Sequence, residues 1–86
     1  MPVISAFYGI IIRMFHTEHN PPHLHAQYQS NAAVYDINKC EITDGSMPKK
    51  QNALIVAWME LHKDELLANW QLAQGHEELI KIKPLK

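Results

Sequence analysis

The pattern of apolar residues changes once along this chain, near Gly45, and that change limits the fold class more than any other feature. Before Gly45, apolar residues occur in short runs rich in β-branched and aromatic side chains, which favour strands. After it, they recur at steps of three and four residues, which is typical of an amphipathic helix. The sequence therefore predicts an α+β protein: a small, curved, mostly antiparallel sheet of N-terminal strands, packed against one long or kinked C-terminal helix.

The N-terminal half is expected to form five short strands. These are predicted over residues 3–8, 10–16, 23–28, 32–37 and 40–43. In the second of them, an alternation of period two puts Ile10, Ile12, Met14 and His16 on one face, and Ile11, Arg13 and Phe15 on the other. Residues 79–83 also alternate, so they are a candidate edge strand near the C-terminus.

The helix is predicted over residues 48–74, as one helix or as two with a break near Lys63. Trp58 and Trp70 lie on its apolar stripe, where their large side chains are best used in the core. His62 shares that stripe, and we expect it to be packed and hydrogen-bonded.

Composition and charge indicate one small domain over residues 1–86, with 47% apolar residues and a formal net charge of −1. The near-zero charge argues against a generally basic nucleic-acid-binding protein. The single cysteine, Cys40, excludes an intramolecular disulfide framework and a cysteine-rich zinc module. The chain shows neither a long apolar run nor the pattern of a signal peptide, so we expect a cytoplasmic protein without a membrane span.

Four histidines fall within one short segment: His16, His19, His23 and His25. Imidazole titrates near neutral pH and is the commonest ligand of transition metals. His23 and His25 are two residues apart in a predicted strand, so both point to the same side. Prolines at positions 21 and 22 prevent pairing as a central strand and make a stiff elbow before this pair.

The other members of a site depend on features that the sequence leaves open. His19 joins the pair only if the elbow folds back, for which a cis bond before either proline is one route. His16 joins if its strand is the neighbour of residues 23–28. Asp36 is a candidate carboxylate ligand or orienting group, but a one-residue slip of the hairpin register would reverse its face.

Three interpretations of the histidine cluster remain open. The first is a site for a divalent transition metal, since zinc, nickel, iron and copper all accept imidazole. The second is a metal-free site that uses imidazole as acid, base or phosphate-binding group. The third is a hydrogen-bonded polar network that only fixes the elbow. If the site is catalytic, we expect hydrolysis, with metal-activated water or an imidazole base.

The segment His19-Asn20-Pro21-Pro22-His23-Leu24-His25-Ala26 resembles the signature of DUF4160, a family of small bacterial proteins of unknown function. The resemblance extends over nearly the whole chain, through segments 2–5, 7–14, 47–50, 58–62 and 66–70. It implies no activity, cofactor or catalytic residue. Family members are often encoded beside another small uncharacterised family, which implies a toxin–antitoxin-like role. His16 and Cys40 depart from the family pattern, which often has an aromatic or polar residue at the first position and a turn glycine at the second.

Two further function classes are predicted as alternatives. One is a non-enzymatic interaction module, with a small operon-encoded protein partner or a second copy of the chain. The other is a weak nucleotide or nucleic-acid binder with imidazole acid–base chemistry. For the latter, Arg13, Lys49 and Lys50 are the candidate anion-binding residues, because cations at a helix start favour phosphate or carboxylate.

Overall fold

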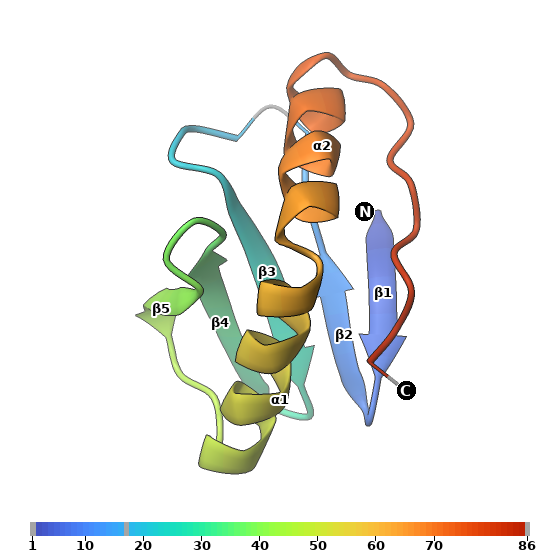
Figure 1. The fold of residues 1–86 in the computed structure, drawn as a ribbon. Helices are drawn as coiled ribbons and strands as arrows, with labels where there is room; N and C mark the ends of the chain where they lie inside the picture. Colours follow the sequence, from blue (N-terminus) through green and yellow to red (C-terminus); the bar gives the residue numbers. More distant parts are fainter. Residues whose placement is uncertain (1, 17, 86) are drawn as a thin grey trace.

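Five antiparallel strands form a meander in which each strand pairs with its neighbours in sequence (Figure 1). The computed structural model describes residues 2–16 and 18–85. The sheet is open, with β1 and β5 at its two edges. Its strands are β1 (Val3–Phe7), β2 (Ile10–Arg13), β3 (His23–Tyr28), β4 (Asn31–Asp36) and β5 (Glu41–Gly45).

Two consecutive helices follow the sheet and lie on one of its faces, α1 (Lys49–Leu61) and α2 (Lys63–Gln74) (Figure 1). The prediction of one long or kinked helix is not confirmed, because His62 separates the two. Asp64 and Glu65 lie in the first turn of α2, where negative charge favours a new helix start. In the described part of the chain, no helix has the length and apolar character needed to span a membrane.

The core lies between the helices and one face of the sheet. The predicted alternation in the second strand is confirmed on this side, since Ile10, Ile12 and Met14 are fully buried. The helix stripe supplies the opposite wall, including Trp58 and Trp70, as predicted. Its other buried members are Ile55, Met59, Leu66 and Ala73.

The opposite face of the sheet carries a row of four side chains from four adjacent strands. Arg13 pairs with His25, His25 with Val34, and Val34 with Asp44. Directly paired residues of antiparallel strands point to the same face. This face is named here the open face. Across β2 to β5 it presents, in that order, a cation, an imidazole, an aliphatic side chain and a carboxylate.

The segment after α2 returns along β1 without forming the predicted edge strand over residues 79–83. Figure 1 shows it descending beside β1, where the Ile82 amide donates to the Ile4 carbonyl at 2.8 Å. Side chains of the helices make the other contacts: Asn69 bonds both the amide and the carbonyl of Ile80, and the Trp58 indole donates to the Lys83 carbonyl. These hydrogen bonds hold the segment in place of the regular backbone hydrogen bonds that an edge strand would have made with β1.

Gly45 ends β5 in a conformation that requires glycine. Its φ is +79°, and an added Cβ would lie 2.2 Å from the carbonyl oxygen of Ala32. Both the backbone angle and the missing space exclude a side chain at this point. The change from strands to helices that the sequence shows near Gly45 therefore coincides with a tight backbone contact.

We expect Gly45→Ala to lower the free energy of unfolding by at least about 2 kcal/mol, because it combines a strained backbone with a steric clash. Gly75→Ala is the matched control. Gly75 has a φ of −88°, and its added Cβ would come no closer than 3.6 Å to a neighbour, so a change within about 0.5 kcal/mol is expected. Urea denaturation of both variants measures the difference, and equal stabilities would contradict this account of Gly45.

Candidate metal centre

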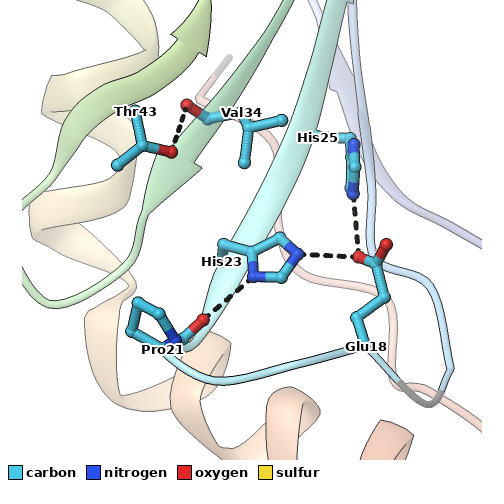
Figure 2. A network of polar contacts seen from close by, with 6 residues as sticks. All are labelled: Glu18, Pro21, His23, His25, Val34 and Thr43. Carbon is cyan, nitrogen blue, oxygen red and sulfur yellow. Dashed lines mark hydrogen bonds and ion pairs between the residues drawn. The ribbon is translucent and has the colours of Figure 1, made fainter.

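Three side chains converge where the elbow meets the start of β3: Glu18, His23 and His25 (Figure 2). The Nε2 atoms of both histidines lie 2.8 Å from the same carboxylate oxygen, Oε1 of Glu18. The alternation of β3 buries Leu24 in the core and leaves the imidazoles on either side of it facing the carboxylate. Two imidazoles and one carboxylate thus meet around a single point.

The second ring nitrogen of His23 is held by the backbone of the elbow. Nδ1 lies 2.9 Å from the carbonyl oxygen of Pro21 (Figure 2). A carbonyl oxygen only accepts, so Nδ1 carries the hydrogen and donates it. In a neutral imidazole the other nitrogen, Nε2, then presents a bare lone pair to Glu18.

The contact between His23 Nε2 and Glu18 Oε1 therefore needs a proton or a metal ion between these two atoms. An ionised carboxylate cannot donate a hydrogen bond, and two lone pairs at 2.8 Å repel each other. Either a second proton on Nε2 or a metal ion satisfies both atoms. His25 is not restricted in this way, since its Nε2 donates to Glu18 in one neutral tautomer.

The Glu18 carboxyl is ionised in this setting. Partial burial acts to raise its pKa, but hydrogen bonds from His25 and His23 and the charge interactions with both rings outweigh burial, so the pKa lies below its ordinary value. A carboxylate held in its charged form is the state that binds a cation.

Aromatic rings support the two imidazoles from the sides. The ring of Phe15 meets the His25 ring edge-on at 4.5 Å between centroids, and the Trp70 indole lies 5.0 Å from the His23 ring. The side chains of Glu18 and His25 keep 30% of their surface exposed, and His23 keeps 17%. The site is thus walled on two sides and reachable from solvent.

Two shallow grooves on the open face border the site, and Val34 and Asp44 line both of them. The first has a volume of about 280 Å³ and includes His25 and Arg13 in its lining. The second has a volume of about 420 Å³ and includes His23. A small molecule can therefore reach either imidazole along the sheet.

Comparison with protein families identifies this chain over most of its length. The family described as "Domain of unknown function (DUF4160)" matches residues 9–71. The chain belongs to this family. The resemblance deduced from the elbow sequence is thereby confirmed, and the matched range contains Glu18, His23 and His25. Comparisons with curated proteins and with solved structures find no match.

In this DUF4160 protein the other predicted histidines lie outside the three-residue group. His19 is exposed and lines the larger groove, although the Asn20–Pro21 bond is cis. His16 donates from Nε2 to the Glu77 carbonyl at 3.0 Å, so it contacts the segment after α2. The structure therefore brings together His23 and His25 from the predicted set.

Asp36 lies opposite His23 in the register of β3 and β4, but its carboxylate has another partner. Oδ1 accepts the backbone N–H of Lys39 at 2.9 Å and so closes the turn after β4. Asp36 therefore stabilises the turn, and the carboxylate that contacts His23 and His25 is that of Glu18.

The predicted anion-binding residues are not assembled. Arg13 lies on the open face of the sheet, whereas Lys49 and Lys50 are exposed at the start of α1. Figure 1 shows that helix start at the end of the molecule opposite the elbow. A shared site of the three residues is therefore absent from the described structure.

Two members of the candidate site in this chain were missed by sequence reasoning. Glu18 stands between two histidines of the cluster, and a carboxylate is the usual companion of paired imidazoles, which was an available signal. The Pro21 carbonyl carries no sequence signal, because its role comes from the backbone conformation of the elbow.

We expect Glu18→Gln to lower the free energy of unfolding at neutral pH by about 1 kcal/mol, because an amide replaces the charged acceptor of two imidazoles. Glu41→Gln is the matched control, since it removes the same charge from an exposed position on β5. Chemical denaturation in the presence of a chelator measures both. Equal stabilities of the two variants would show that Glu18 does not join the imidazoles in solution.

Proposed function

We propose that this protein binds a divalent transition metal ion through Glu18 Oε1, His23 Nε2 and His25 Nε2. The observation that carries the proposal is the arrangement around His23. Its Nδ1 is fixed on a backbone carbonyl, while its Nε2 faces a carboxylate oxygen. Histidine ligands of metals usually donate their second N–H to a carbonyl or carboxylate in this manner, which fixes the tautomer.

The ligand set and its spacing fit such an ion. The three candidate ligand atoms lie within 4.8 Å of one another. Ligand bonds of about 2.0–2.2 Å place ligand atoms about 3.3–3.6 Å apart in a tetrahedral site. The present separations of 2.8 Å between Glu18 and each imidazole are shorter than this, so ion binding requires an outward movement of the Glu18 side chain. Two histidines and one carboxylate are typical of zinc and non-haem iron sites.

Three protein ligands and partial exposure indicate an open coordination position. Structural zinc sites are closed by four protein ligands, whereas sites that bind substrate or activate water keep one position free. We therefore propose a metal centre that exchanges ligands with solvent. If it is catalytic, a metal-activated water carries out hydrolysis. Nothing in the described residues favours the interaction-module or nucleotide-binding alternatives, which stay predictions.

Zinc binding to untagged protein tests this proposal. We expect one bound ion per chain by calorimetry. His23→Ala, His25→Ala and Glu18→Gln should each weaken binding at least about tenfold, as loss of even an outer partner does at metal sites. Nitrogen-detected imidazole NMR of the zinc complex should show the hydrogen of His23 on Nδ1 and the metal on Nε2.

His19→Ala is the matched control, because it removes an exposed imidazole of the same segment that lies outside the group. Its zinc affinity should equal that of the wild type. Absence of zinc, nickel, iron(II) and copper binding would reduce the cluster to a polar network. A loss of binding in His19→Ala as large as that in His23→Ala would mean that the ligand set is assigned wrongly.

A further inference from the structure

The smaller groove on the open face runs from β2 to β5 beside His25. It is lined by the row Arg13, His25, Val34 and Asp44, together with Phe15, Gln27 and Ala32 among others. We propose that this groove binds a small organic monocarboxylate, with its carboxylate between Arg13 and the metal and its hydrocarbon part along the groove. The metal contact rests on the proposed function, whereas the Arg13 contact and the fit to the groove do not.

Arg13 supplies the anion contact. It is the direct cross-strand neighbour of His25, and its guanidinium is positioned by one hydrogen bond, from a terminal N–H to Gln27 Oε1 at 2.8 Å. A guanidinium has five N–H donors, so this bond leaves donors for a ligand. Its planar fork matches a carboxylate, which it binds through two parallel hydrogen bonds.

The charges around the groove favour an anion at its His25 end. A divalent ion on Glu18 and two neutral imidazoles carries one net positive charge, and Arg13, on the strand position opposite His25, adds another. Asp44 lies on β5, at the other end of the row. A ligand with one carboxylate at the Arg13 end is therefore attracted, whereas a second anionic group near Asp44 is repelled.

The remaining lining suits a hydrocarbon group. Phe15, Val34 and the exposed Ala32 border the groove, whereas Ala26 and Ala33 line it from strand positions whose side chains are buried in the core. A volume of about 280 Å³ lies just below the usual range of ligand pockets, so the groove suits a single ring or a short chain. The larger groove contains the carboxylates of Asp36 and Asp44 and lacks Arg13, which makes it the poorer site for an anion.

Benzoate is the probe for this inference, and benzamide is its uncharged counterpart. Calorimetry and backbone amide NMR are recorded with the zinc-loaded protein and with the metal-free protein. We expect zinc-loaded wild type to bind benzoate at least about tenfold more tightly than Arg13→Gln, with Arg13→Lys in between because lysine keeps the charge but not the fork. Shifted amides should cluster at residues 13, 25–27, 32–34 and 44–45.

The controls separate this inference from the proposed function. Lys49→Gln removes one exposed charge at the far end of the molecule and should bind benzoate as wild type does. Zinc affinity is measured for every variant, so that loss of the ion is not mistaken for loss of the Arg13 contact. If zinc does not bind, the proposed function fails, while weaker benzoate binding by metal-free Arg13→Gln still supports the anion site. Equal benzoate affinity of wild type and Arg13→Gln, or benzamide binding as tight as benzoate, overturns the inference.

Discussion

Packing of the helix layer against one face of the meander decides what the other face presents. Trp58 and Trp70 are buried in one core with strand residues such as Ile12 and Leu24, and large apolar area of this kind dominates the stability of a small domain. Because strand side chains alternate, a register that buries Leu24 must expose His23 and His25 on either side of it. A slip by one residue would bury two imidazoles, so the core also fixes the geometry of the candidate site.

The elbow adds the third group through backbone geometry. Pro21 and Pro22 provide no N–H donors, so this segment does not extend the sheet. Its carbonyl at Pro21 holds one nitrogen of His23, and the chain just before it supplies Glu18. A rigid imidazole and a flexible carboxylate side chain then face each other. In the proposed metal site, this combination would fix the direction of one ligand and let the other adjust to the ion.

Much of the fold follows from local sequence patterns, as particular elements show. The strand predicted over 23–28 coincides with β3, and the alternation of Ile10 and Ile12 against Ile11 and Arg13 matches their burial. The helices begin near the predicted start but divide at His62, because acidic residues able to start a helix follow it. The C-terminal segment alternates like a strand, yet Asn69 and Trp58 take up its backbone groups, and such long-range side-chain bonds leave no local pattern.

The candidate site was only partly predictable, because local patterns indicate the direction of strand side chains but not the contacts made by loops and turns. The spacing of His23 and His25 is a local property of a strand, so their shared direction follows from the sequence. Whether His19 or Glu18 joins them depends on several loop dihedrals between residues 16 and 23. The partner of Asp36 depends on a turn, in which the Lys39 amide takes the carboxylate.

The contact between His23 and Trp70 also links the site to the helix layer. The indole of Trp70 is almost fully buried in α2, and its ring lies against an imidazole whose other edge faces Glu18. Binding of the proposed ion at that edge would therefore change the electronic surroundings of the indole. The indole of Trp70 is thus placed to report, through its fluorescence, on an ion bound at the three-ligand cluster of Glu18, His23 and His25.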